Sequence, residues 1–289
     1  MKSVGPSPKD VEARICWTVE LAEKTYLTRL EADHVAQALP GQFLQLCVRA
    51  DFSPLLRLPL SVCAADPATG TVDVAYEDVG PKTHILSRLP SGSQVGCMGP
   101  LGNYFPDPVR ILDSARLPDT NKGAVLLVGG GVGMPPLLFY GSRVLSRDPQ
   151  AEVCLLAGAR TAAKHFPDAV MAGSASRYRR ATDDGTSGHA GLVTDLLKEE
   201  LAKAAAVTVY TCGPVGMMAA VATICRDSQV PCLASLEEYM ACGFGVCVGC
   251  VVELAAQAQV PGQDHTPYTR YSRVCVDGPV YDTSQIQWA

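Results

Sequence analysis

The amino-acid sequence predicts an α/β plus β architecture: an N-terminal antiparallel β-barrel, a parallel α/β domain and a small C-terminal segment. Three observations lead to it. Short strand-like runs fill the first hundred positions, apolar strands alternate with helical segments from Gly123, and four cysteines follow Ser235. Evenly spaced short strands are typical of small barrels, and strand–helix alternation is typical of parallel sheets. We therefore expect domains at 1–112, 123–235 and 236–289.

The barrel is predicted from four β-branched or alternating runs, 14–32, 42–50, 58–66 and 71–79. The turn residues Pro40-Gly41, Pro67 to Gly70 and Gly80-Pro81 separate these runs. Such punctuation between short strands favours antiparallel connections. The polar stretch from Leu112 to Lys122 then predicts a linker.

The α/β domain is predicted from three strands, 124–130, 152–160 and 207–213, each followed by a helical stretch. The strands are apolar throughout, as in a parallel sheet that is covered on both faces. The basic run Arg177 to Arg180 lies between these elements, and we expect it to be a solvated loop.

Composition narrows the class of protein. Of the 289 residues, 47% are hydrophobic and 18% charged, which excludes an intrinsically disordered chain. The net charge of −5 argues against nucleic-acid binding, which requires a basic face. The uncharged stretches 123–142 and 204–225 contain glycines and prolines that would break a membrane-spanning helix, and the N-terminus has no signal-peptide core. We expect a cytoplasmic protein with no membrane span.

The twelve cysteines therefore predict a metal site, because disulfides are rare in the cytosol. Cys242, Cys247 and Cys250 have the spacing C-x4-C-x2-C, and Cys275 follows 24 residues later. This is the plant-type spacing of a [2Fe–2S] cluster. Glycines between the first three cysteines suit a loop whose amides point inward. A structural zinc site and a Cys247–Cys250 dithiol pair are the alternatives.

A glycine-rich turn predicts a nucleotide site. Gly129, Gly130, Gly131 and Gly133 follow an apolar strand and open a helix, a context that brings amides to a pyrophosphate. The sequence Cys212, Gly213 and Pro214 ends another strand of the same sheet, so both motifs are expected at one ligand crevice. A tight turn without a ligand is the alternative.

Together these motifs resemble the ferredoxin-reductase superfamily, and specifically the electron-transfer subunits of class 1B dihydroorotate dehydrogenases. The resemblance covers roughly residues 11–285. It depends on the segments 58–61, 80–83, 99–103 (Gly-Pro-Leu-Gly-Asn) and 238–243 (Glu-Tyr-Met-Ala-Cys-Gly), the glycine-rich turn and Cys212-Gly213-Pro214.

The resemblance implies FAD at the boundary between barrel and sheet, and NAD(H) at the glycine-rich turn and Cys212-Gly213-Pro214. Its expected flavin contacts are Leu58, Pro59, Leu60, Ser61, Ala75, Tyr76, Glu77, Lys82 and Thr83. Three of these depart from the family pattern: Leu58 replaces an arginine, Glu77 a basic residue and Lys82 a glycine. A carboxylate beside phosphate is repulsive, so of the three departures Glu77 is the one expected to oppose FAD binding.

The resemblance further implies an oxidoreductase subunit that relays electrons between a dihydroorotate-oxidising catalytic subunit and NAD through [2Fe–2S] and FAD, in pyrimidine biosynthesis. The expected partner is an FMN-containing catalytic subunit, in a heterotetramer. The alternatives are the small subunit of another NAD(P)H-dependent ferredoxin, transhydrogenase or hydrogenase reductase, and an iron–sulfur redox sensor without flavin.

Overall fold

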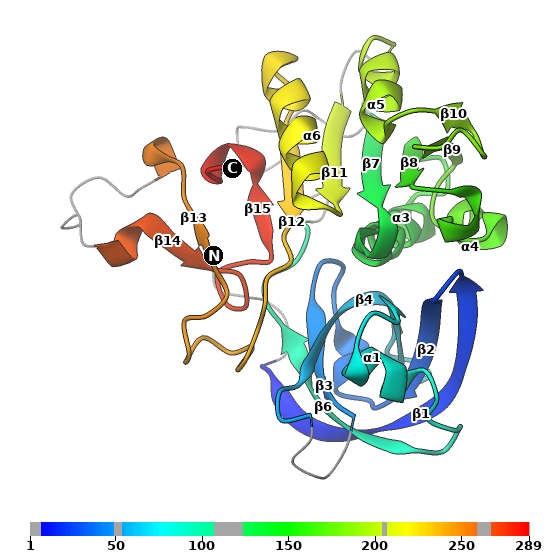
Figure 1. The fold of residues 1–289 in the computed structure, drawn as a ribbon, viewed down its shortest axis with the longest axis vertical. Coiled ribbons are helices and arrows are strands. Elements are labelled where there is room, and N and C mark those ends of the chain that lie inside the picture. Colours follow the sequence, from blue (N-terminus) through cyan, green and yellow to red (C-terminus); the bar gives the residue numbers. More distant parts are fainter. Residues whose placement is uncertain (1–6, 49–53, 107–123, 204–206, 259–266, 289) are drawn as a thin grey trace.

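The computed structural model describes residues 7–48, 54–106, 124–203, 207–258 and 267–288. A β-barrel lies below an α/β sheet, and the C-terminal segment lies beside both (Figure 1). This arrangement matches the predicted fold class. The predicted linker from Leu112 to Lys122 lies outside the described residues.

The barrel is closed, with the strand order β1-β2-β5-β4-β3-β6 and antiparallel pairing throughout. Its strands are β1 (Lys9–Ala22), β2 (Thr25–Glu31), β3 (Phe43–Cys47), β4 (Leu58–Asp66), β5 (Thr71–Glu77) and β6 (Gln94–Leu101). Side chains alternate between the two faces of a strand, so Leu44 and Leu46 of β3 enter the barrel core while Phe43 packs outside it. The short helix α1 (Pro81–Leu86) follows β5.

The second sheet has the order β10-β9-β8-β7-β11-β12-β15, and its strands are parallel up to β12. They are β7 (Ala124–Gly130), β8 (Val153–Ala159), β9 (Arg177–Thr182), β10 (His189–Ala190), β11 (Val207–Cys212), β12 (Cys232–Ser235) and β15 (Val280–Asp282). The helices are α3 (Met134–Arg147), α4 (Asp168–Ala172), α5 (Val193–Leu201) and α6 (Val215–Asp227). Residues of β7 are buried along the whole strand, as expected for a sheet covered on both faces.

The basic run is strand β9 and not the predicted solvated loop. Arg177 and Arg179 form ion pairs of 2.7 and 2.9 Å with Glu200 of α5, whose side chain is 3% exposed. A buried carboxylate requires cationic partners, and the arginines on this strand supply them. The prediction failed because Glu200 is far from the run in sequence.

Helix α3 joins the sheet to the barrel. Its residue Phe139 belongs to the barrel core, whereas Leu137 and Leu138 pack with the sheet. Arg143 donates a hydrogen bond of 2.8 Å to the carbonyl of Ala65 in β4. The carboxyl ends of β7 and β11 point towards the barrel, so the two glycine-containing motifs face it (Figure 1).

The C-terminal segment contributes β15 to the edge of the second sheet and forms a two-stranded sheet from β13 (Val251–Glu253) and β14 (Tyr271–Arg273). Asn103, just after β6, fixes this segment to the barrel: its carboxamide donates to the carbonyl of Val280 at 2.8 Å and accepts from the Val280 amide at 2.8 Å. Within the described residues, no helix is both long and apolar enough to cross a membrane.

Candidate functional site

The four predicted cluster cysteines come together in the C-terminal segment. Cys242, Cys247 and Cys250 lie on the loop between β12 and β13, and Cys275 follows β14. The amide of Val274 donates a 2.8 Å hydrogen bond to the carbonyl of Cys250, which holds the fourth cysteine beside the loop. Cys250 and Cys275 are buried, whereas Cys247 is exposed.

The four sulfurs form two pairs. The thiols of Cys250 and Cys275 are hydrogen-bonded to each other, and a side-chain hydrogen bond also joins Cys242 to Cys247. Among the described residues, no three His, Cys, Asp or Glu side chains surround a single point in a way that suits one metal ion. A tetrahedral zinc ion needs four ligands around one centre, while two irons take two thiolates each. Two pairs of thiols match two irons that take two thiolates each, so the donor set fits a [2Fe–2S] cluster.

The loop also supplies the amide donors that such a group requires. Burial alone would raise the pKa of the Cys242 thiol, but hydrogen bonds from the amides of Cys247, Phe244 and Val246 lower it to about 6. The Cys247 amide lies 3.4 Å from the Cys242 sulfur. Burial and the hydrogen bond with Cys250 raise the pKa of Cys275 to about 12. Metal binding releases the protons of such thiols.

Backbone conformation explains the glycines of this loop. Gly243 and Gly245 have φ of +78° and +89°, which L side chains rarely adopt. Val248 also has a positive φ, +56°, although a β-branched residue is strained there. The loop keeps this strained turn between its second and third cysteines, where the chain must reverse tightly enough to present both sulfurs.

A cleft of about 650 Å³ lies between the barrel and the second sheet. It is lined by all the residues expected to contact the flavin: Leu58, Pro59, Leu60, Ser61, Ala75, Tyr76, Glu77, Lys82 and Thr83. The walls are predominantly apolar, with a few polar groups, which is the usual character of a cofactor site.

Two of the three departures from the family pattern, Glu77 and Lys82, have a polar partner in the structure. Glu77 forms a 2.6 Å ion pair with Lys164, which ends the short 3-10 helix after β8, so its charge is compensated. Arg57, the arginine that directly precedes Leu58, pairs with Asp10 at 2.6 Å and is not among the residues that line the cleft. Lys82 donates a 2.9 Å hydrogen bond to the carbonyl of Arg57, and burial lowers the pKa of this ammonium. Lys82 thus places its amino group at the backbone of the residue before Leu58, the position where the family has an arginine.

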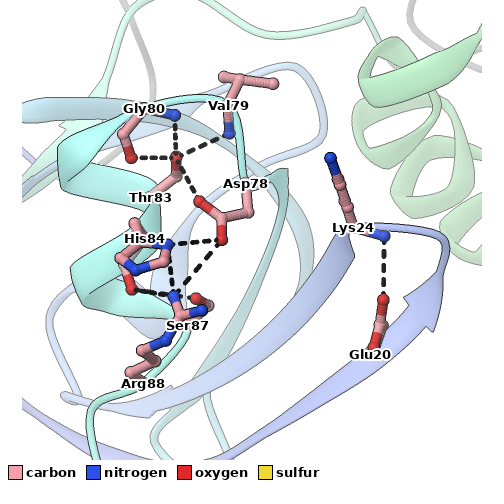
Figure 2. A network of polar contacts seen from close by, with 9 residues as sticks. All are labelled: Glu20, Lys24, Asp78, Val79, Gly80, Thr83, His84, Ser87 and Arg88. Carbon is pink, nitrogen blue, oxygen red and sulfur yellow. Dashed lines mark hydrogen bonds and ion pairs between the residues drawn. The ribbon is translucent and has the colours of Figure 1, made fainter.

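Thr83 organises the turn that leads into α1 (Figure 2). Its hydroxyl accepts hydrogen bonds from the amides of Val79 and Gly80 at 3.1 and 3.0 Å. Asp78 is held at the same turn by His84, at 3.1 Å. The Thr83 hydroxyl thus stabilises the turn between β5 and α1. This turn places Thr83 in the wall of the cleft.

The two predicted nucleotide motifs are in direct contact. Strand β11 pairs with β7 so that Cys212 lies opposite Gly129, and a Cβ at Gly133 would overlap the backbone of Cys212 and Gly213. Gly131 has φ +55° and open space around it. Val132 and Val215, which adjoin these motifs, line the same cleft as the flavin residues. The Cys212 thiol itself is buried in the sheet core.

The segment 236–240 also lines the cleft, although none of its residues was expected to contact the flavin. Within it, Glu237 lines the cleft and is exposed there. Protein atoms nevertheless surround its carboxyl group closely, and the resulting desolvation raises the pKa of this group to about 7. Met240 packs in the same core as Cys250 and Cys275. Two sequence signals pointed to this segment: it overlaps the motif 238–243, and it directly precedes Cys242.

Comparison with known proteins identifies the family. The model of the iron-sulfur cluster binding domain of dihydroorotate dehydrogenase B matches residues 237–287, and the oxidoreductase NAD-binding domain matches 127–223. The electron transfer subunit of dihydroorotate dehydrogenase B (NAD(+)) from Geobacillus thermodenitrificans is 37% identical over 92% of this chain and 94% of its own length. The chain belongs to the family of dihydroorotate dehydrogenase B electron transfer subunits.

Further relatives agree over nearly the full length. The electron transfer subunit from Desulforamulus reducens is 31% identical over 97% of this chain and 99% of its own. A solved NADH-dependent reduced ferredoxin-NADP oxidoreductase, studied for flavin-based electron bifurcation, is 27% identical with a TM-score of 0.78, covering 96% of this chain and 90% of that one.

These findings confirm the predicted family, fold class and cofactor set. The chain is an oxidoreductase electron transfer subunit, with an iron–sulfur domain, an NAD-binding domain and the ferredoxin-reductase-like fold that accompanies FAD. As an electron transfer subunit, it works with a catalytic partner.

Proposed function

We propose that this chain relays electrons between NAD and an FMN-containing catalytic subunit that oxidises dihydroorotate, within a heterotetramer. In the biosynthetic direction the electrons run from dihydroorotate to NAD⁺. Three sites on this chain take part: the cluster cysteines Cys242, Cys247, Cys250 and Cys275, the flavin cleft, and the nicotinamide site at the glycine-rich turn and Cys212-Gly213-Pro214.

The observation that carries the proposal is the continuity of one segment through two sites. Residues 236–240 line the cleft, and the chain reaches Cys242 two residues later. Met240 packs with Cys250 and Cys275, while Phe43 of the barrel belongs to both this core and the cleft wall. Because the two sites share a wall, electrons would have only a short distance to cross between them.

When bound, FAD exchanges a hydride with NAD and single electrons with the cluster, which carries one electron at a time. The residues of this chain position these groups. The apolar wall from Leu58 to Leu60 excludes water, and Ser61 brings a hydroxyl to the cleft. Val132 and Val215 bring the glycine-rich turn and the Cys212-Gly213-Pro214 motif to the same cleft, so a nucleotide there would meet the flavin directly.

The surface around the cysteine loop supports a docking partner. Five large apolar side chains are exposed there, between 44% and 96%: Tyr239, Phe244, Val246, Val248 and Val276. Clustered exposed apolar side chains are characteristic of protein interaction sites. Because Cys247 is exposed on the same loop, a catalytic subunit that covers this surface would lie next to the cluster.

The test is purification of the native complex, followed by anaerobic assay of NAD⁺ reduction with dihydroorotate as the electron donor. We expect flavin and [2Fe–2S] absorption bands and dihydroorotate-dependent formation of NADH. A complex without a dihydroorotate-oxidising subunit would contradict the assigned partner. Reduction of ferredoxin in place of this activity would favour the reductase function named for the relative of known structure.

A further inference from the structure

Gln45 is a fully buried polar side chain in the wall between the barrel and the cysteine loop. It lies on β3, and its exposed fraction is 0%. The neighbouring Leu44 and Leu46 point into the barrel core, so alternation along the strand directs Gln45 outward. Phe43, which shares its face, packs in the same core as Cys250 and Cys275.

The Gln45 carboxamide lies against the cysteine loop at the residue after Cys242. A Cβ at Gly243 would come within 2.5 Å of Gln45 Nε2 and 2.8 Å of its Cγ. With φ of +78°, Gly243 allows both the tight turn and this close approach. The side chain of Gln45 therefore sits directly on the backbone that presents the first cluster cysteine.

Both ends of this carboxamide lack a partner. Among the described residues, neither Nε2 nor Oε1 of Gln45 has a hydrogen bond. Burying an amide without hydrogen bonds costs free energy, so native proteins rarely leave one unpaired without a reason. A nearby glutamine shows the ordinary solution: Gln42 is also buried, but it donates to the Gly102 carbonyl and accepts from the Leu39 amide, both at 2.9 Å.

The position of Gln45 in the sheet links it to the flavin cleft as well. Its partner across β4 is Pro59, which lines the cleft. Gln45 thus lies between the wall of the flavin site and the cysteine loop. Sulfur atoms of iron–sulfur clusters accept hydrogen bonds, and these bonds help to set the reduction potential.

We propose that Gln45 donates its side-chain N–H to a sulfur of the cluster beside Cys242, and that this bond raises the reduction potential of the cluster. The inference rests on the proposed cluster ligands. A donor near sulfur stabilises the reduced cluster, which carries one more negative charge. The hydrogen bond would therefore make the cluster easier to reduce.

The first experiment is an EPR-monitored potentiometric titration of the cluster in the purified holoprotein. Gln45→Met keeps the size of the side chain but removes the donor, and we expect it to lower the equilibrium constant for cluster reduction about tenfold, which is about 59 mV for one electron. Gln45→His keeps an N–H and should recover more than half of this shift. The matched control Gln42→Met, at a buried glutamine that already has partners, should leave the potential unchanged.

A second measurement uses the wild-type protein and so does not depend on how the variants fold. Glutamine labelled with ¹⁵N in the side chain should produce a nitrogen hyperfine coupling in the pulsed EPR spectrum of the reduced cluster. Absence of this coupling would overturn the inference. So would an equilibrium constant for cluster reduction in Gln45→Met that lies within twofold of the wild-type value. A wild-type protein without any [2Fe–2S] signal would instead refute the cluster assignment itself.

Discussion

Replacing Gly133 by alanine should separate two strands of the nucleotide-binding sheet. An added Cβ would lie closer than 3.0 Å to backbone atoms of both Cys212 and Gly213. Backbone atoms cannot rotate away as a side chain can, so the carboxyl ends of β7 and β11 would have to move apart. Overpacking of this kind costs about 1–3 kcal/mol, and contact with two rigid backbone groups favours the upper end.

A loss of about 3 kcal/mol corresponds to a fall in melting temperature of roughly 6–12 °C for a chain of this size. Differential scanning calorimetry of the holoprotein measures it. Gly131→Ala is the matched control, because open space surrounds this position and only its φ of +55° opposes alanine. That strain costs about 1 kcal/mol, or roughly 2–4 °C.

Stability and nucleotide binding should respond differently to the two substitutions. Gly133→Ala should lose more stability, and Gly131→Ala should lose more affinity for NAD(H). The Cβ of Gly131→Ala projects into the space proposed for the nucleotide, so we expect weaker NAD(H) binding with nearly normal stability. If Gly133→Ala melted at the wild-type temperature, the direct backbone contact between the glycine-rich turn and Cys212-Gly213 would be refuted.

Two further substitutions test the charges of the cleft. Glu237 has a pKa of about 7 in the folded chain, above its ordinary value of 4.5, so the folded state binds more protons and loses stability as pH rises through this window. Glu237→Gln should therefore raise the melting temperature relative to wild type at pH 8 but not at pH 4.5, and an equal difference at both pH values would count against the raised pKa. Lys164→Ala removes the partner of Glu77 and leaves a carboxylate uncompensated in the cleft. We expect about fivefold weaker FAD binding to the deflavinated protein, from a loss of about 1 kcal/mol, with recovery in the Lys164→Ala/Glu77→Gln double variant; unchanged affinity in Lys164→Ala would refute this role of the ion pair.

The sequence was most informative where the chemistry is local. The spacing of Cys242, Cys247 and Cys250 is a local pattern, and the glycine-rich turn lies between a strand and a helix that are visible in the sequence. Uninterrupted apolar strands likewise sufficed to predict the parallel sheet, because burial on both faces leaves no alternation.

Contacts between distant segments could not be predicted in this way. Glu77 and Lys164 are 87 positions apart, and only the packing of the barrel against the sheet brings them together. Gln45 and Gly243 meet for the same reason. In both cases the sequence shows the chemistry of each residue but not which residue lies beside it. The repulsion predicted at Glu77 therefore did not take account of Lys164, which compensates the charge.

The central claim is that electrons reach NAD⁺ through the cluster. It is tested most directly by anaerobic, dihydroorotate-dependent NAD⁺ reduction in the complete complex that carries Cys250→Ser in this chain. We expect this overall reaction to be lost, while NADH still bleaches the flavin of the same complex at a rate near that of wild type. A complex that lacks the cluster by EPR but retains the wild-type rate of dihydroorotate-dependent NAD⁺ reduction would contradict the claim.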